Sequence, residues 1–250
     1  MAKYEHDSVV PFEQSTDSKK KQVANMFDQI AFRYDFLNRF LSGGIDIYWR
    51  KRAVAELKEI RPKAILDVAT GTGDLAIMAE KFLKPERVIG IDISEGMLQK
   101  GREKLQKIGK SAIISLQTGD SEAINFPDSS FDAITVAFGV RNFQDLEKGL
   151  AEMLRVLTPG GKLVILEFSK PNQPGVTEMY NLYMKIVTPG IGTLISKNKE
   201  AYKYLSSSVK AFPEGETFLH ILDKTGFTNT YLKRLSLGIC TIYCGRKTHG

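Results

Sequence analysis

The stretch that most constrains the fold of this chain is residues 64–82, where an apolar run meets a glycine-rich turn and then a helix. Residues 64–69 (AILDVA) predict a buried strand, and residues 75–82 have helical spacing. Gly71 and Gly73 lie between them and allow a tight turn with close backbone approach by a ligand. This unit predicts a parallel sheet with a ligand site at the carboxyl end of the strand.

The same alternation continues along the chain. Further strands are expected at 87–91, 111–116, 131–137 and 162–166, with helices near 95–108 and 146–157 between them. Residues 228–235 and 239–246 are also strand-like, and the short connection between them predicts a hairpin. The pattern therefore predicts an α/β fold, in which a mostly parallel sheet carries helices on both faces and one antiparallel strand near its end.

The regions outside this alternation define the expected domain organisation. Residues 1–16 are expected to form a flexible arm, and residues 17–60 two helices, of which the first reaches about Leu41. Residues 172–212, rich in Tyr and Met, are expected to form helices inserted before the C-terminal hairpin. Because 250 residues suit one large domain, we interpret 17–250 as a single unit.

The composition excludes several classes of protein. No apolar run approaches the ~18 residues of a membrane-spanning helix, and the first residues lack the apolar centre of a secretory signal. The two cysteines and three scattered histidines form no zinc-ligand pattern, so no metal is expected. A net charge of +6 is small for 250 residues and leaves a non-enzymatic RNA- or membrane-binding module weakly supported. We expect a cytoplasmic protein that binds no nucleic acid.

Three aspartates lie at or just after the ends of the first three predicted strands. Asp92 can accept hydrogen bonds from both hydroxyls of a ribose, which suits NAD and S-adenosylmethionine. Asp67, beside the glycine turn, would repel a diphosphate but attract the ammonium or sulfonium group of S-adenosylmethionine. Asp120 can accept a hydrogen bond from an adenine amino group, because a carboxylate is acceptor-only. Together these carboxylates favour S-adenosylmethionine as the cofactor.

Other interpretations of this region remain open at the level of sequence. Gly71-x-Gly73-x-x-Ala76 also fits the dinucleotide fingerprint, so an NAD-dependent oxidoreductase is one alternative. Asp67 and the antiparallel terminal strand speak against it. A plain tight turn without a ligand is a second alternative, and a solvated loop position is the ordinary role of a residue such as Asp120.

An ordered set of motifs resembles a known class of enzymes. Its members are Asp67-x-x-x-Gly71-x-Gly73, Gly90-Ile91-Asp92, Phe131-Asp132-Ala133-Ile134 and Leu157-Thr158-Pro159-Gly160-Gly161-Lys162-Leu163. The set covers about residues 50–170 and resembles the class I S-adenosylmethionine methyltransferases. The resemblance implies a Rossmann-like seven-stranded sheet and S-adenosylmethionine as the methyl donor.

A narrower resemblance spans nearly the whole chain, from about Val23 to Arg246. Its motifs are Tyr34-Asp35-x-x-Asn38, Trp49-Arg50, Asp67 to Asp74, Phe138-Gly139-Val140-Arg141-Asn142 and Tyr204-Leu205-x-x-Ser208. They resemble the UbiE/MenG family, which carries out C-methylation in menaquinone and ubiquinone biosynthesis. In addition to the glycine turn, the resemblance implies cofactor contacts at Thr72, Asp92, Asp120 and Ser121.

The same resemblance implies a polyprenylated quinol as the acceptor, with demethylmenaquinol methylated to menaquinol. A polyprenyl-methoxybenzoquinol of ubiquinone biosynthesis is the alternative within the family, and rRNA, a protein or a sterol is the alternative outside it. A chain without a membrane span that acts on such a quinol must visit the bilayer surface, so transient membrane-surface contact is expected. The oligomeric state stays open, a homodimer included.

Arg141 and Asn142 are the candidate catalytic residues. They follow the fourth predicted strand, whose carboxyl end faces the ligand crevice of an open α/β sheet. We hypothesise that Arg141 stabilises a phenolate or orders a water, and that Asn142 orients the quinol oxygen. The simpler alternative is that the pair only caps the next helix. Apolar residues within 172–212 are candidates for a groove that holds the prenyl tail, with ordinary helix packing as the alternative.

Overall fold

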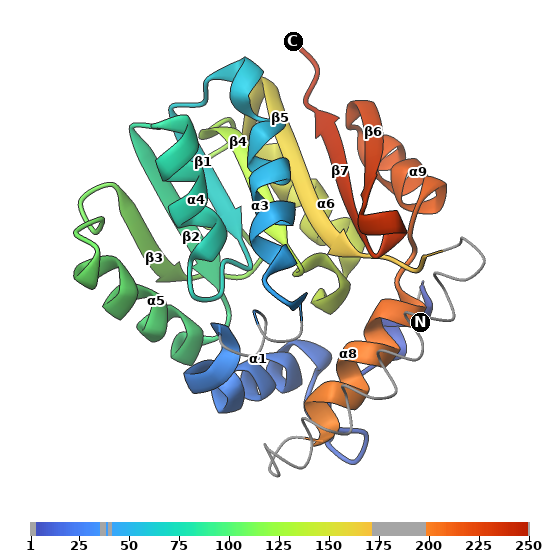
Figure 1. Cartoon of the computed structure of the whole chain (residues 1–250). Helices are drawn as coiled ribbons and strands as arrows, with labels where there is room; N and C mark the ends of the chain where they lie inside the picture. The colour runs from blue at the N-terminus through green and yellow to red at the C-terminus, as the bar shows by residue number, and fades with distance from the viewer. Residues whose placement is uncertain (1–3, 36–38, 40–41, 172–198, 250) are drawn as a thin grey trace.

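The computed structural model describes residues 4–35, 39, 42–171 and 199–249, and a seven-stranded sheet forms its core (Figure 1). The strands are β1 (Ala64–Val68), β2 (Arg87–Asp92), β3 (Ile114–Thr118), β4 (Phe131–Ala137), β5 (Leu157–Phe168), β6 (Thr228–Leu235) and β7 (Cys240–Arg246). Their order in the sheet is β3-β2-β1-β4-β5-β7-β6. β1 to β5 pair in parallel, and β7 runs antiparallel to both of its neighbours. The predicted Rossmann-like fold with one antiparallel strand is confirmed.

Helices cover both faces of the sheet (Figure 1). On one face lie α3 (Ile45–Ala55), α4 (Asp74–Leu83) and α5 (Glu95–Lys107), and on the other lie α6 (Leu146–Val156) and α9 (Glu216–Thr225). Successive strand side chains alternate between the two layers, so Ile65 packs with the first group and Leu66 with the second. Both side chains are fully buried, which explains why β1 is apolar along its length.

Some element boundaries differ from the expected ones. β3 begins at Ile114 rather than at residue 111, because the preceding residues form a turn in which Ile113 N donates to Lys110 O at 3.1 Å. The helix expected to reach about Leu41 is α1 (Lys19–Ile30), which gives way to a 3₁₀ turn, η2 (Ala31–Arg33). This turn brings Asp35 to the glycine-rich turn, where Thr72 Oγ1 donates to Asp35 Oδ1 at 2.6 Å.

Residues 4–16 pack against the domain rather than extending from it. Within η1 (Glu5–Ser8), His6 is fully buried and its ring meets the edge of Phe212, with 5.6 Å between centroids. The Tyr4 hydroxyl donates to Glu147 Oε1 at 2.5 Å. The sequence predicts a flexible arm for residues 1–16. In the structure, residues of this segment contact the domain through Tyr4 and His6.

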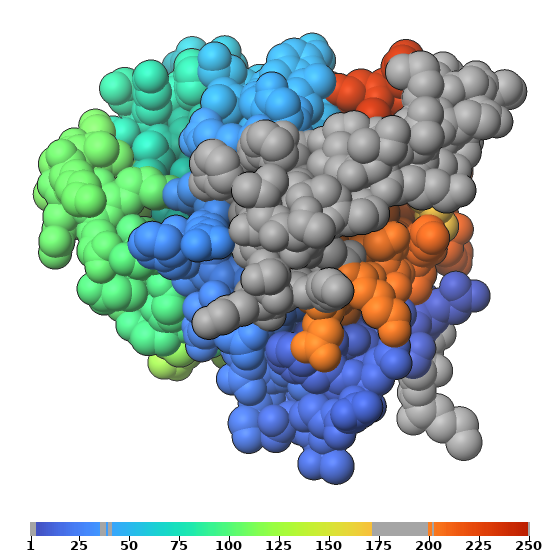
Figure 2. Space-filling view, turned by 60° about the horizontal axis from the view of Figure 1, so that its bottom comes forward, coloured from blue at the N-terminus to red at the C-terminus, as the bar shows by residue number. Residues whose placement is uncertain are grey.

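The expected insertion is described only in its last part. α8 (Lys199–Ala211) is helical as expected, whereas residues 172–198, which carry the apolar positions expected to form a groove, lie outside the described residues. Figure 2 shows α8 beside the N-terminal residues on one face of the molecule. Tyr204 of α8 is buried there against Val23 and Met26 of α1. Among the described residues, no helix is long and apolar enough to span a membrane.

Candidate functional site

A cavity lies at the carboxyl ends of β1, β2 and β4, where the order of strands in the sheet changes direction. Open α/β sheets bind ligands at this position. The cavity is lined by Lys20, Val23, Phe27, Tyr34, Ala69, Gly71, Asp92, Ile93, Met97, Gly119, Asp120, Ser121, Glu122, Ala137, Phe138, Gly139, Asn142, Phe143 and Gln144. Of the predicted site residues, those that line it are Gly71, Asp92, Asp120, Ser121 and Asn142. Those absent from its lining are Asp67, Thr72, Gly73 and Arg141.

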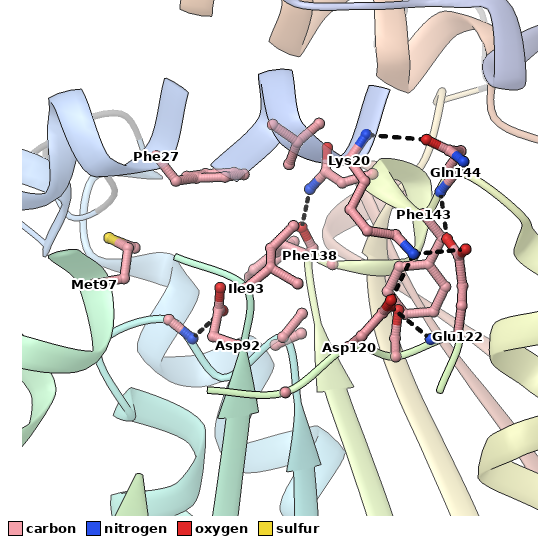
Figure 3. A pocket seen from close by; sticks show the side chains of 18 of the residues that line it. Lys20, Phe27, Asp92, Ile93, Met97, Asp120, Glu122, Phe138, Phe143 and Gln144 are labelled. Atoms are coloured by element: carbon pink, nitrogen blue, oxygen red, sulfur yellow. Dashed lines mark hydrogen bonds and ion pairs between the residues drawn. The ribbon is translucent and has the colours of Figure 1, made fainter. Parts of the chain in front are cut away.

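Asp92, the last residue of β2, faces the cavity from below, with Phe27 on the opposite side (Figure 3). Its Oδ2 accepts from Gly71 N at 2.8 Å and its Oδ1 from Ser94 N at 2.9 Å. Burial raises the pKa of Asp92 above its ordinary value, and these backbone hydrogen bonds oppose the rise. Because a carboxylate has about four lone-pair positions, these hydrogen bonds leave it able to accept from a hydroxyl group of a ligand.

Gly71 forms the floor of the cavity beside Asp92. Its φ of +57° lies in the left-handed region that favours glycine. A Cβ at this position would lie 3.2 Å from Met97 Cε, and Met97 is itself part of the lining. A side chain here would therefore narrow the space for a ligand. The absence of one allows the close backbone approach that the sequence predicts at this glycine.

Asp120 lies at the other end of the cavity and is bound to a lysine of α1. Figure 3 shows Lys20 reaching down between two carboxylates, and its Nζ lies 2.6 Å from Asp120 Oδ2 and 2.9 Å from Glu122 Oε2. Glu122 is anchored in turn, because its Oε1 accepts from Gln144 N at 2.9 Å and Asp145 N at 3.0 Å. Asp120 thus points its carboxylate into the cavity while a cation occupies one of its oxygens.

α1 covers the cavity and is fixed at both ends. Val23 and Phe27 line the cavity from this helix. Near the end of the helix, Asp28 Oδ1 accepts from Ser94 Oγ at 2.6 Å and from Gly96 N at 2.9 Å, which ties α1 to the start of α5. Together with the Lys20 ion pairs at its start, this contact holds the apolar side of α1 over Asp92.

Asp67 lies behind the cavity rather than in it. Its two oxygens accept from the hydroxyls of Thr70 and Thr135, both at 2.6 Å, and the residue is 1% exposed. Burial raises the pKa of Asp67 to about 6, although both hydroxyls oppose the rise. The described geometry gives Asp67 a direct role in holding the glycine turn against β4.

Thr72, a predicted cofactor contact, is held by neighbouring side chains. Its hydroxyl donates to Asp35 and accepts from Lys104 Nζ at 3.0 Å. Lys104 pairs with both Asp35 and Asp74, at 2.6 Å and 2.8 Å. Gly73, with a φ of +80°, is the N-cap of α4 and turns the chain into that helix. Both residues therefore shape the turn from its far side.

Arg141 lies in a 3₁₀ turn, η4 (Val140–Asn142), directly after β4. Its Nη1 donates to Phe138 O at 2.5 Å and to Glu167 Oε1 at 2.7 Å, and Glu167 is fully buried at the end of β5. Its Nε is buried and has no hydrogen-bond partner among the described residues. Arg141 is thus a fixed cation, with one unused donor, adjoining the cavity wall.

Asn142, the next residue, lines the cavity. Its Nδ2 donates to Phe138 O at 3.3 Å, and its Oδ1 accepts from the hydroxyl of Tyr204 at 3.1 Å. The predicted pair is therefore brought together at the cavity, but each member is held by a residue that the sequence did not single out for a role.

A cluster of three aromatic rings, those of Phe138, Phe168 and Trp49, forms one wall of the cavity; we call it the aromatic wall. Phe138 lines the cavity and stacks on Phe168 with 4.4 Å between centroids, while Trp49 meets Phe138 edge-on at 6.3 Å. Phe138 and Ala69 both have a positive φ, +58° and +52°, at the ends of β4 and β1. Backbone strain of this kind clusters at functional sites, because tight packing must hold it in place.

Several lining residues come from outside the motifs. Lys20, Val23 and Phe27 follow the i, i+3, i+7 spacing of one helix face, so this spacing could have predicted which side of α1 covers the cavity. From the sequence, Phe27 is a candidate both for covering the cofactor and for packing the helix on the sheet. The pairing of Lys20 with Asp120 spans 100 residues and has no signal in the sequence.

The cavity suits an adenosine-like cofactor with a positively charged tail. One carboxylate, that of Asp92, lies beside the glycine floor, and a second, that of Asp120, lies at the opposite end, where its oxygens accept from Glu122 N and Lys20 Nζ. Apolar side chains of Ile93, Met97 and Phe143 also line the cavity, with Ile93 beside Asp92, and provide surfaces for a planar ring (Figure 3). The carboxylates of Asp92 and Asp120 in the lining place negative charge where it would repel a diphosphate.

Comparison with known proteins agrees with this geometry. Residues 15–247 match the model of the ubiE/COQ5 methyltransferase family. A protein from Bacteroides fragilis named demethylmenaquinone methyltransferase is 51% identical over 245 residues, which is 98% of this chain and 99% of that protein. A protein from Geobacter sulfurreducens named ubiquinone/menaquinone biosynthesis C-methyltransferase UbiE is 45% identical over 230 residues, or 92% and 90% of the two chains.

Among solved structures, a SAM-dependent methyltransferase from Thermotoga maritima is similar in fold. The TM-score is 0.61 at 18% sequence identity, and the match covers 90% of this chain and 99% of that one. At this identity the similarity concerns the fold alone.

Proposed function

The chain belongs to the ubiE/COQ5 methyltransferase family, and from this premise we propose that it methylates a ring carbon of a polyprenylated quinol with S-adenosylmethionine as the methyl donor. The acceptor we propose is demethylmenaquinol, in line with the name of the 51%-identical relative. The observation that carries the proposal is that Asp92, Asp120 and Asn142 surround one cavity at the switch point of the sheet.

In the proposed complex, Asp92 accepts hydrogen bonds from the ribose hydroxyls and Asp120, with Ser121, holds the edge of the adenine. Support comes from the remaining acceptor capacity of Asp92 and from the position of both residues in the lining. Bound S-adenosylmethionine supplies an electrophilic methyl group on a sulfonium sulfur. Asp67 makes no direct contact with the cofactor in this proposal, because the hydroxyls of Thr70 and Thr135 occupy its oxygens. It contributes negative charge from behind the turn.

Arg141 and Asn142 act on the acceptor in this proposal. Loss of the hydroxyl proton makes the quinol ring carbon more nucleophilic, so a group that stabilises the phenolate oxygen lowers the barrier to methyl transfer. Asn142 lines the cavity and donates to that oxygen, while the fixed charge of Arg141 stabilises it from behind the wall. Arginine stays protonated at any working pH, so its role is that of a cation rather than a base. The aromatic wall excludes water from the reacting pair.

A polyprenyl-methoxybenzoquinol is the second candidate acceptor, because the 45%-identical relative is named for both pathways. Either acceptor carries a long apolar tail, so we further propose that the protein contacts the membrane surface without crossing it. Leu237, which is 62% exposed in η5 (Ser236–Gly238), supports this contact. The Trp49 indole donates to Ser236 Oγ at 2.8 Å, which places Leu237 next to the aromatic wall.

Quinone profiling of cells that lack the protein tests the proposal. We expect demethylmenaquinone to accumulate, and the wild-type gene, but not an Asn142→Ala variant, to restore the methylated pool. Accumulation of an unmethylated benzoquinol would select the second candidate acceptor. A normal quinone pool would refute both.

A further inference from the structure

Tyr204 of α8 connects the cover of the cavity with the candidate catalytic turn. Its ring is 3% exposed and packs with Val23 and Met26 of α1, and Val23 lines the cavity. Its hydroxyl reaches Asn142 Oδ1 at 3.1 Å, across 62 residues of sequence. One side chain thus contacts both the helix over the cofactor cavity and the residue proposed to meet the acceptor.

The two hydrogen bonds of the Asn142 amide fix its orientation. The Tyr204 hydroxyl donates to Oδ1, and Nδ2 donates to Phe138 O at 3.3 Å. An amide nitrogen carries two hydrogens, so one donor of Asn142 remains for a ligand. Burial raises the pKa of the Tyr204 hydroxyl, which keeps the proton that this arrangement needs.

We propose that Tyr204 is a positioning residue that makes Asn142 a hydrogen-bond donor toward the acceptor oxygen. A donor stabilises a phenolate, whereas the carbonyl oxygen of the same amide would repel it. Without the Tyr204 hydroxyl, the amide keeps only its 3.3 Å contact with Phe138 O, so its orientation is less firmly fixed and its oxygen faces the cavity in part of the molecules. The inference rests on the proposed function, since it concerns the quinol oxygen.

The Tyr204→Phe variant is the direct test, because it keeps the ring and removes only the hydroxyl. We expect kcat with a reduced quinol to fall about five- to tenfold, the effect of one hydrogen bond of about 1 kcal/mol. We also expect the pH–kcat profile to shift to higher pH, because a weaker donor leaves the quinol hydroxyl harder to ionise. This shift is the decisive readout. The dissociation constant of S-adenosylhomocysteine should change less than twofold.

Tyr231→Phe is the matched control, because Tyr231 donates its hydroxyl to Glu56 Oε2 at 2.7 Å, away from the cavity. This variant should keep the wild-type kcat and pH profile. In an Asn142→Ala background, Tyr204→Phe should have no further effect on kcat, because the group it positions is already gone.

Asn142→Asp tests the same inference without altering Tyr204, and it remains informative if Tyr204→Phe folds poorly. Aspartate offers only acceptors, so its kcat should fall below that of Asn142→Ala. An Asn142→Asp variant with wild-type turnover, or a folded Tyr204→Phe variant with unchanged kcat and pH profile, would overturn the inference. Absence of quinol methylation by the wild-type protein would instead refute the proposed function, and the inference with it.

Discussion

The two halves of the cavity are built in different ways. In the cofactor half, Asp92 is held by backbone N–H groups of Gly71 and Ser94, all within the glycine turn and the end of β2. In the acceptor half, the 3₁₀ turn after β4 is held by side chains from distant elements. Glu167 of β5 binds Arg141 across 26 residues, and Tyr204 of α8 binds Asn142 across 62.

This difference determines how each half should respond to substitution. Backbone donors exist whatever the neighbouring side chains are, so the contacts that orient Asp92 need only the aspartate and the glycine turn. The acceptor half requires two matched side-chain pairs, and a change in either partner alone leaves a buried polar group without its partner. Substitutions should therefore damage stability in the acceptor half and ligand affinity in the cofactor half.

The largest effect is expected at the ion pair of Arg141 and Glu167, which are 7% and 0% exposed at their side chains. Glu167→Ala should lower the free energy of unfolding by about 3–5 kcal/mol, because it leaves a buried cation unpaired. The double variant Arg141→Met with Glu167→Leu should regain most of this loss, because two apolar side chains replace the pair. Urea unfolding measures both.

Turnover separates the two roles of this pair. The double variant should stay inactive although it is stable, since it lacks the cation proposed to stabilise the acceptor oxygen from behind the cavity wall. A stable double variant with wild-type kcat would assign Arg141 a purely structural role.

Asp67 gives a pH-dependent effect on stability. Its pKa is about 6 in the folded chain against an ordinary value of 3.8, so between these values the folded state holds a proton that the unfolded state has released. Stability contributed by this group therefore falls as pH rises through that window. Asp67→Asn should gain stability relative to the wild type between pH 4 and pH 6, by up to about 3 kcal/mol. A difference that is constant across these pH values would contradict the burial of an ionisable Asp67.

Asp92→Ala should weaken binding of S-adenosylhomocysteine about 100-fold, because charge-assisted hydrogen bonds contribute about 1.5–3 kcal/mol each. Asp132→Ala is a matched control, since Asp132 Oδ2 also accepts from two backbone N–H groups, those of Lys63 and Ala64, but lies outside the cavity lining. Titration calorimetry should detect a loss in the first variant alone. Equal losses in both would indicate a general effect on folding.

The smallest effect is expected at Lys20. Its ammonium occupies Asp120 Oδ2 at 2.6 Å, so Lys20→Met should free this oxygen for the adenine. Because such partly exposed pairs contribute about 0.5 kcal/mol, affinity for S-adenosylmethionine should rise two- to threefold. Weaker binding would mean that Lys20 contacts the cofactor or closes α1 over it.

The same difference between the two halves determines what the sequence could predict. The sheet, the antiparallel strand and the positions of Asp92 and Asp120 follow from apolar alternation and from motifs confined to a few residues. Asp67 was assigned to the cofactor by its negative charge beside the glycine turn, and Thr72 by the family resemblance. Spacing along the chain does not reveal which face of the turn a side chain occupies, and both face away from the cavity.

The pairings of the acceptor half could not be predicted from the sequence, although Tyr204 belongs to one of the family motifs. Glu167 ends an apolar strand, and Tyr204 lies in an amphipathic helix, where burial is the ordinary expectation. Only the three-dimensional arrangement of β5 and α8 brings them to Arg141 and Asn142. Residues 4–16 are a similar case, since the burial of His6 depends on Phe212 of a distant segment.

Methyl transfer by the purified protein is the most direct test of the whole account. The measurement follows an isotope-labelled methyl group from S-adenosylmethionine to a reduced demethylmenaquinone analogue, with the product identified by mass spectrometry. The label should appear on a ring carbon of the quinol with the wild-type protein, and at much lower yield with Asn142→Ala although S-adenosylhomocysteine still binds. Cofactor binding without any label on the quinol ring would contradict the account.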